Sequence, residues 1–162
     1  MVFKLKRFPE LGVELHIKSG AFSSEDVIQY FRSLGPADAV RWIYYCDKTA
    51  ETSALDLGHM PELKRTVTAK RKELFGDRPP PAPAIVCGPG DNREFFEFWS
   101  RLLTSGEPPA PAPLLFPTLK AACEGLGLPD AACEALERAV AAPQGDGGRH
   151  AAGPIAAPPP QT

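Results

Sequence analysis

Residues 40–47, with the sequence VRWIYYCD, constrain the fold more than any other segment of the chain. This nearly unbroken run of β-branched and aromatic residues is typical of a strand that is buried on both faces in the middle of a parallel sheet. The run ends at the carboxylate of Asp47, and the polar segment 48–53 follows it. Because ligands and partners of open α/β sheets meet the carboxyl ends of such strands, we expect a functional site near Asp47.

Length and charge limit the class of protein. A chain of 162 residues is long enough for one domain with a real core. The net charge of −2 gives no overall basic surface, so we expect no nucleic-acid partner. The chain has no run of eighteen apolar residues and no secretory signal at its amino terminus, so we expect neither a transmembrane segment nor secretion.

The cysteines point to a reducing compartment. Cys46, Cys87, Cys123 and Cys133 stand apart within apolar segments and form no CxxC pair. Such isolated cysteines are typical of small buried side chains in a protein without disulfides. We therefore predict a soluble cytoplasmic protein.

The amino-terminal part predicts a hairpin followed by a helix. Residues 2–5 and 13–17 alternate apolar and polar side chains, as half-exposed strands do, and the turn between them favours an antiparallel hairpin at the sheet edge. Ser23 is placed to cap a helix, with Asp26 near its positive end. Its apolar face consists of Val27, Ile28, Phe31 and Leu34.

The remaining chain alternates helices and strands. In order, we expect a helix from between residues 52 and 57 to residue 75, a strand at 84–87, a helix opened by a capping box at 91–94, an edge strand at 114–116, and helices at about 118–126 and 129–142. In the third helix the spacing predicts a core face of Phe95, Phe98, Trp99 and Leu102, widened by Phe96 and Leu103.

This order predicts an α/β fold with a single open mixed sheet of about four to five strands and helices packed on it. We expect residues 1–105 to form the α/β domain and residues 106–142 to form a helical extension packed on it. Residues 143–162 consist of Gly, Ala, Pro and polar residues with little to bury, which predicts a disordered tail.

The best polar cluster follows the central strand and comprises Asp47, Thr49, Thr52 and Ser53, with His59 downstream. A hydroxyl there, at the start of a helix, is a candidate for phosphorylation or for contact with a partner. Alternatively, Thr52 or Ser53 only caps the helix and Asp47 only ends a strand. A third reading is an enzyme that acts through Asp47 and His59, but the chain has no nucleophile elbow and no convincing triad. We expect no enzymatic activity, no cofactor and, because no two histidines have ligand spacing, no metal.

Two further features have weaker functional readings. Lys64, Arg65, Lys70, Arg71 and Lys72 predict a basic helix face, which is either solvated or a docking surface for an acidic protein or anionic lipid. The glycine turn at 88–90 lacks the lysine and the length of a Walker loop. An aspartate at the helix N-cap, where we expect Asp91, would also repel phosphate.

The order of these elements resembles the STAS/SpoIIAA-like family over residues 2–103. The resemblance implies a small α/β domain of bacterial regulation that binds partner proteins, and in some members a serine at the start of the second helix is phosphorylated. The nearest position here is Ser53, with Thr52 beside it, although the family's Asp-Ser-Ser-Gly signature is replaced by Glu51, Thr52, Ser53 and Ala54.

These observations give two hypotheses for function. The first is a non-enzymatic bacterial regulatory or protein-interaction module, phospho-switched near Thr52 or Ser53. The alternative is a small-molecule or lipid-binding protein with an apolar pocket between the sheet and the helix that carries Phe95 and Trp99.

Overall fold

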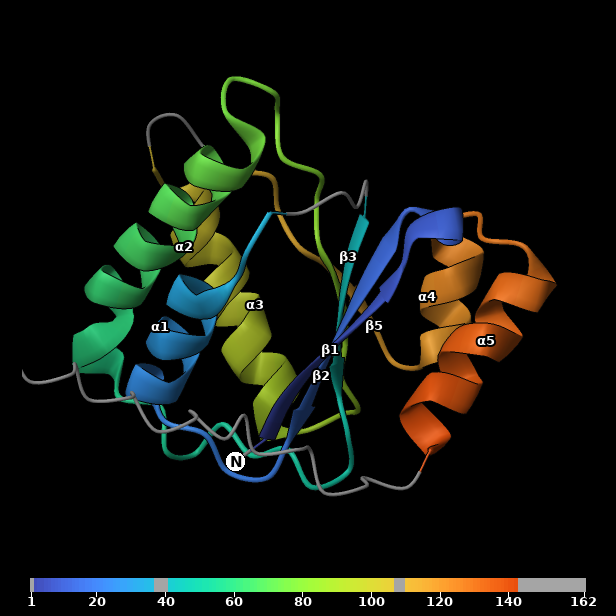
Figure 1. Ribbon diagram of the computed structural model, residues 1–162. Coiled ribbons are helices and arrows are strands. Elements are labelled where there is room, and N and C mark those ends of the chain that lie inside the picture. Colours follow the sequence, from blue (N-terminus) through green and yellow to red (C-terminus); the bar gives the residue numbers. More distant parts are fainter. Residues whose placement is uncertain (1, 37–40, 107–109, 143–162) are drawn as a thin grey trace, which may run out of the picture.

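The computed structural model describes residues 2–36, 41–106 and 110–142. Five strands form one mixed sheet in the order β1-β2-β3-β4-β5 (Figure 1). The strands are β1 (Val2–Phe8), β2 (Val13–Ser19), β3 (Arg41–Cys46), β4 (Ala84–Val86) and β5 (Leu114–Phe116). β1 pairs antiparallel with β2, and all later neighbours pair in parallel. The predicted mixed sheet and its initial hairpin are confirmed.

Helices cover both faces of the sheet, so the molecule has three layers (Figure 1). One face carries α1 (Ser24–Ser33), α2 (Met60–Phe75) and α3 (Asp91–Thr104). The other face carries α4 (Leu119–Gly125) and α5 (Asp130–Ala141), which come from the predicted extension. β5 also belongs to residues 106–142 and forms the edge of the same sheet. Two 3-10 turns, η1 (Pro9–Leu11) and η2 (Leu57–His59), complete the fold.

Strand alternation divides the interior into two cores, one on each face of the sheet. Beneath α4 and α5, the buried side chains that the sheet contributes are all aliphatic: Val13, Leu15, Ile17, Ile43, Ala84 and Val86. Beneath α1–α3, the buried apolar side chains from the sheet are mostly larger or more polarisable: Trp42, Tyr44, Cys46 and Ile85. The period of two in the strands therefore separates two chemically different interiors.

β2 is the clearest departure from the sequence-based expectation. It is not an edge strand, because it lies between β1 and β3, and all seven of its residues are buried. Both of its faces are covered by helices, so the polar positions of its alternating pattern are also removed from solvent. Glu14, His16 and Lys18 consequently lie inside the protein, on the side of α1–α3.

The first two helices differ in how well they were predicted. α1 starts as expected, with Ser23 and Asp26 forming a capping box. α2 begins only at Met60, after η2, so Thr52 and Ser53 do not stand at its N-terminus. Leu57, in the turn before α2, is 65% exposed. Pro61 occupies the first turn of α2, where the missing N–H of a proline costs no helical hydrogen bond.

The third helix also differs in detail. Its N-cap is Gly90, no side chain caps it, and Asp91 is its first helical residue, so the predicted capping box is wrong. The positive φ of Gly90, 110°, is a conformation that suits glycine. Its buried face is formed by Phe96, Trp99 and Leu103, whereas Phe98 is exposed.

Two predictions fall partly outside the described residues. The central strand is observed as Arg41–Cys46, and Val40 lies outside the described residues. The predicted tail, residues 143–162, lies outside them as well.

Candidate functional site

The segment after the central strand forms a compact loop at the carboxyl edge of the sheet. We call residues 47–59 the edge loop. Asp47 Oδ1 accepts hydrogen bonds from the backbone N–H and the hydroxyl of Thr49, at 2.7 and 2.6 Å. The Thr49 hydroxyl oxygen in turn accepts from Gly20 N at 2.9 Å. The start of the edge loop is thereby fixed to the segment that leaves β2.

Two more anchors hold the rest of the edge loop. Asn92, in the first turn of α3, accepts from Thr52 N at 3.1 Å and donates to Ala50 O at 2.7 Å. The hydroxyl of Ser24, at the start of α1, accepts from Asp56 N at 3.1 Å. Three separate elements of the fold therefore set the conformation of one loop.

The predicted site residues are only partly brought together. Asp47 and Thr49 contact each other, but His59 instead pairs with Asp56, with 3.3 Å between Nδ1 and Oδ2. Thr52 is buried and Ser53 is exposed. Of the two hydroxyls predicted as phosphorylation sites, Ser53 is the accessible one.

The charge of Asp47 is stabilised within this loop. Burial opposes its ionisation, but hydrogen bonds from Ser19, Thr49 and Ala50 hold the pKa of its carboxyl below the ordinary value. Asp47 is therefore charged at neutral pH and ties the loop together, which is a positioning role rather than that of a general acid.

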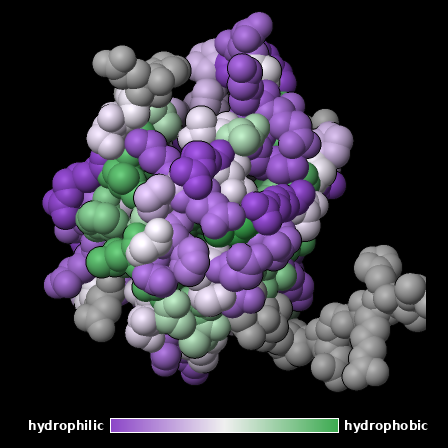
Figure 2. Space-filling model, turned by 90° about the vertical axis from the view of Figure 1, so that its left-hand side faces the viewer, coloured by the Kyte–Doolittle hydropathy of each residue, from purple (hydrophilic) through white to green (hydrophobic). Residues whose placement is uncertain are grey.

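The five basic residues of α2 do not form one continuous solvated face. Arg65 and Lys72 are exposed, but Lys70 and Arg71 are buried, so the predicted basic face is wrong for these two. Lys70 donates to Leu34 O at 3.1 Å and pairs with Glu73 at 3.0 Å. Lys64 donates to Leu102 O at 2.7 Å. The outer side of the molecule at α1 and α2 is mainly hydrophilic, with separate apolar patches (Figure 2).

A cavity of about 40 Å³ lies between the sheet and the α1–α3 layer. Its apolar lining includes Leu63, Val67, Phe95, Phe96, Trp99 and Leu103. Its polar lining consists of Lys18, Tyr44 and Arg71. This is the place where the sequence suggested an apolar pocket, but the basic and hydroxyl groups in it were not anticipated.

The spacing of the apolar residues in α2 already indicated that Arg71 is buried. Leu63, Val67 and Phe75 are buried at intervals of four or eight residues, and Arg71 falls on the same row of α2. Counting Arg71 among neighbouring basic residues concealed this register. Tyr44 was predicted only as part of the buried strand at residues 40–47.

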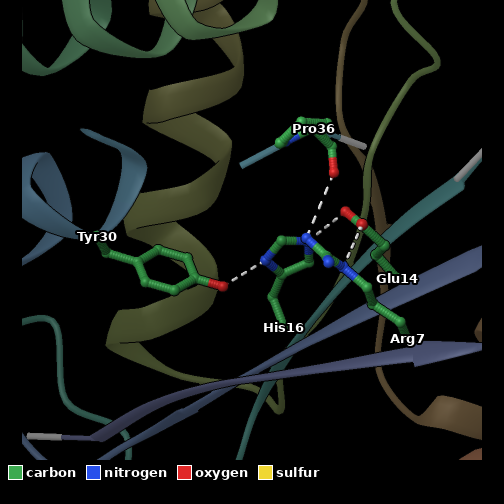
Figure 3. A network of polar contacts seen from close by, with 5 residues as sticks. All are labelled: Arg7, Glu14, His16, Tyr30 and Pro36. Atoms are coloured by element: carbon green, nitrogen blue, oxygen red, sulfur yellow. Dashed lines mark hydrogen bonds and ion pairs between the residues drawn. The ribbon is translucent and has the colours of Figure 1, made fainter. Parts of the chain in front are cut away.

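A second, partly buried network of polar side chains connects β1, β2 and α1 (Figure 3). Arg7 Nε donates to Glu14 Oε1 at 3.0 Å, and Arg7 also donates to Pro36 O at 3.4 Å. His16 Nε2 lies 3.8 Å from the other oxygen of Glu14, while His16 Nδ1 lies 2.5 Å from the Tyr30 hydroxyl. The network joins the hairpin to the α1 layer.

His16 is neutral in this setting. Its side chain is fully buried, and burial, together with the charges of Lys18 and Arg7, lowers its pKa to about 3. Burial likewise raises the pKa of Tyr30. Since neither group titrates near neutral pH and both are enclosed, the network is suited to holding structure rather than to transferring protons.

The thiols have no sign of nucleophilic activation. Burial raises the pKa of Cys46 to about 11, more than the nearby Lys18 charge lowers it. Burial also raises the pKa of Cys123 to about 12, with a further contribution from Cys133. Thiols that stay protonated at neutral pH are poor nucleophiles.

Within residues 2–36, 41–106 and 110–142, no three His, Cys, Asp or Glu side chains are grouped so that they could hold a metal ion. In the same part of the chain, no helix has the length and apolar character needed to span a bilayer.

Comparisons with known proteins concern the fold. No protein-family model and no curated protein matches the chain. Among solved structures, the chain is similar to the anti-sigma factor antagonist SpoIIAA in its unphosphorylated form, with 11% sequence identity and a TM-score of 0.39. The match covers 78% of this chain and 98% of that chain. The five-stranded mixed sheet with its helices is an α/β architecture, as the order of elements in the sequence predicted.

Proposed function

We propose that this protein is a non-enzymatic regulatory module that binds a partner protein through the edge loop. The observation that carries the proposal is the fixed conformation of that loop. Hydrogen bonds from the β2–α1 connection, α1 and α3 hold its backbone, while several of its side chains face solvent. A surface that is ordered before binding loses less conformational entropy when a partner docks.

The exposed groups of the edge loop suit a protein partner. Leu57 is a large apolar side chain that lies open to solvent, and Lys48, Glu51 and Ser53 are exposed polar residues of the same loop. A surface hollow beside them is lined by Ala50, Thr52, Pro89 and Asn92, among others. An apolar anchor with polar groups around it is the usual composition of a protein-binding patch.

Phosphorylation of Ser53 is the form of regulation that this surface would support. A phosphate adds roughly −1.5 to −2 charges at neutral pH. Ser53 lies two residues from the exposed Glu51, so the added charge would make this part of the loop strongly acidic. Because Ser53 is not at a helix N-terminus, we expect the phosphate to act on the partner by charge rather than by reordering a helix.

The test compares partner capture by charge-matched variants. The full chain, Leu57→Asp, Ser53→Asp and the control Ala131→Asp are used for affinity purification with quantitative mass spectrometry. Ala131 is an exposed residue of α5, on the opposite face of the sheet, so its variant introduces the same charge far from the edge loop. We expect one protein to be retained by the wild type and the control, but reduced at least tenfold, about 1.4 kcal/mol, by Leu57→Asp.

Direct binding then decides the proposal. The captured protein is purified, and its dissociation constant is measured with each variant by calorimetry. Equal affinity for the wild type, Leu57→Asp and Ser53→Asp would show that the edge loop is not the binding surface. Unchanged affinity for Ser53→Asp alone would remove the phosphorylation switch and leave the docking surface.

A second candidate function, the binding of a small molecule, is supported by a different observation. The cavity beneath α3 has apolar walls, yet Arg71 and Tyr44 contribute polar groups to it. This candidate does not depend on the edge loop.

A further inference from the structure

Two polar side chains of the cavity lack hydrogen-bond partners. Arg71 is 6% exposed, and among the described residues neither its Nε nor its Nη1 has a hydrogen-bond acceptor. Tyr44 is 5% exposed, and its hydroxyl likewise finds no partner in the described part of the chain. Buried guanidinium and hydroxyl groups are normally satisfied, because leaving them unpaired away from water is costly.

The fold places these two groups on the lining of the same cavity. Arg71 lies on the buried row of α2, and Tyr44 is in the middle of β3, on the sheet face that α1–α3 cover. Burial raises the pKa of Tyr44, and the positive charge of Arg71 partly offsets that effect, as expected for neighbouring groups. Tyr44 therefore keeps its proton and is a hydrogen-bond donor at neutral pH.

Lys18 is the third polar group of the cavity, and its ammonium group already has aromatic partners. Its Nζ lies 5.1 Å from the ring centroid of Tyr44 and 5.3–5.8 Å from the centroids of Phe3, Phe22 and Phe96. An ammonium surrounded by aromatic faces is stabilised by cation–π interaction. The group that still needs a counter-charge is therefore Arg71.

We propose that the cavity binds a small monocarboxylate, with its two oxygens on Arg71 and Tyr44 and its hydrocarbon part against Leu63, Trp99 and Leu103. This proposal rests on the second candidate function above and not on the edge loop. Nε–H and Nη1–H of Arg71 both lack acceptors, so the guanidinium can donate a charge-assisted hydrogen bond to one carboxylate oxygen while the Tyr44 hydroxyl donates to the other. The apolar walls favour an organic anion over a fully hydrated inorganic one.

The size of the cavity limits the ligand. A space of roughly 10–15 Å³ by the same measure holds one water molecule, and the cavity of about 40 Å³ is about three times larger. It therefore suits a ligand of only a few non-hydrogen atoms, of the size of acetate or propionate. A single unpaired guanidinium also matches a monoanion better than a phosphate dianion.

Propionate is the probe for the test. The full chain is titrated with sodium propionate at constant ionic strength, with sodium chloride as the balancing salt, and binding is followed by calorimetry and by NMR. We expect saturable binding of propionate and a rise in Tm that grows with its concentration, since a ligand that binds only the folded state stabilises it. Shifts in the NMR signals of Trp99 and Tyr44 would place the ligand in the cavity.

Variants test each contact separately. Arg71→Met removes the charge while keeping an apolar chain, and we expect propionate affinity to fall by about tenfold or more. Tyr44→Phe removes one hydroxyl and keeps the ring, and we expect a loss of about five- to tenfold. Arg65→Met is the matched control, because Arg65 is an exposed residue of the same helix, and its affinity should equal that of the wild type.

Three results would overturn the proposal. They are the absence of saturable propionate binding to the wild type, unchanged affinity in both Arg71→Met and Tyr44→Phe, and equal saturable binding of chloride, which would indicate a site for spherical anions. None of these results depends on the partner-binding experiment with Leu57→Asp. Failure of the carboxylate site and failure of the edge-loop proposal are therefore distinguishable.

Discussion

Helices cover both faces of the sheet, but the side chains buried on the two faces differ in chemistry. Beneath α4 and α5, Leu15, Ile43 and Ala84 meet the buried Leu119 and Leu136, and the core consists of apolar side chains. Beneath α1–α3, apolar side chains share the interior with Glu14, His16, Lys18, Tyr44 and Arg71. An apolar core contributes stability through burial alone, whereas buried polar groups contribute only when each finds a partner.

This difference has a simple origin in the strands. Successive residues of β2 and β3 point to opposite faces, so the polar residues at positions 14, 16 and 18 of β2 lie on one side. β2 sends Val13, Leu15 and Ile17 to one core and Glu14, His16 and Lys18 to the other. β2 therefore contributes an apolar face to one core and a polar face with specific contacts to the other.

The largest expected effect is on the apolar face. Leu136→Ala removes a fully buried side chain of α5, and we expect the free energy of unfolding to fall by about 2–5 kcal/mol. Leu57→Ala, at an exposed leucine, should change it by less than about 0.5 kcal/mol. Urea denaturation followed by circular dichroism measures both. A loss below about 1 kcal/mol for Leu136→Ala would show that α5 is not an integral part of this core.

An effect of intermediate size is expected when the pH is changed, because the free energy of unfolding depends on the protonation of His16 beneath α1–α3. The pKa of His16 is about 3 in the folded protein against 6.5 ordinarily, so the folded state binds this proton less tightly than the unfolded state. The free energy of unfolding should therefore be highest above pH 6.5 and fall as the pH drops towards 3, by about 2 kcal/mol between pH 6.5 and 5.

Two variants, one on each face of the sheet, test whether this pH dependence of stability comes from His16. His16→Gln cannot take up the proton, so its stability should be nearly independent of pH between 5 and 6.5. Leu136→Ala should be less stable throughout but keep the wild-type dependence on pH. Denaturant unfolding at a series of pH values tests this, and an equal slope in His16→Gln and wild type would contradict the role of His16.

The smallest expected effect is a gain in stability. Arg71→Met replaces a buried charge, whose Nε and Nη1 have no hydrogen-bond acceptor among the described residues, with an apolar side chain, and we expect the unliganded protein to become more stable by about 1 kcal/mol. Arg65→Met, on the exposed side of α2, should leave stability within about 0.5 kcal/mol of the wild type. Thermal unfolding without added carboxylate measures both, and a large loss for Arg71→Met would reveal a structural role for the charge.

Local signals in the sequence were sufficient for the elements that depend on neighbouring residues. The hairpin between β1 and β2 follows from alternation and from Gly12, whose φ of 60° ends η1. The start of α1 follows from Ser23 and Asp26, which satisfy each other's backbone groups. The start of α2 was placed too early, because Asp56 caps the 3-10 turn η2 before the helix begins.

Features that depend on distant residues were not predicted. The burial of β2 requires β1 and β3 on either side, together with helices on both faces, and no local pattern states this. The edge-loop anchor at Asn92 joins residues forty positions apart. The cavity likewise required the register of α2 against β3, which brings Arg71 to Tyr44. The sequence predicted a candidate site after β3, where the edge loop lies, but it assigned Thr52 to the start of a helix.

The outermost strands restrict how the molecule can associate. β1 carries Lys4, Lys6 and Arg7, and charges on an edge strand discourage another chain from extending the sheet. β5 is only three residues long and lies between Pro113 and Pro117, which have no N–H to donate to a new neighbour. Growth by strand addition, and the aggregation that follows from it, are therefore disfavoured at both ends of the sheet, which leaves loops and helices as the surfaces available for assembly.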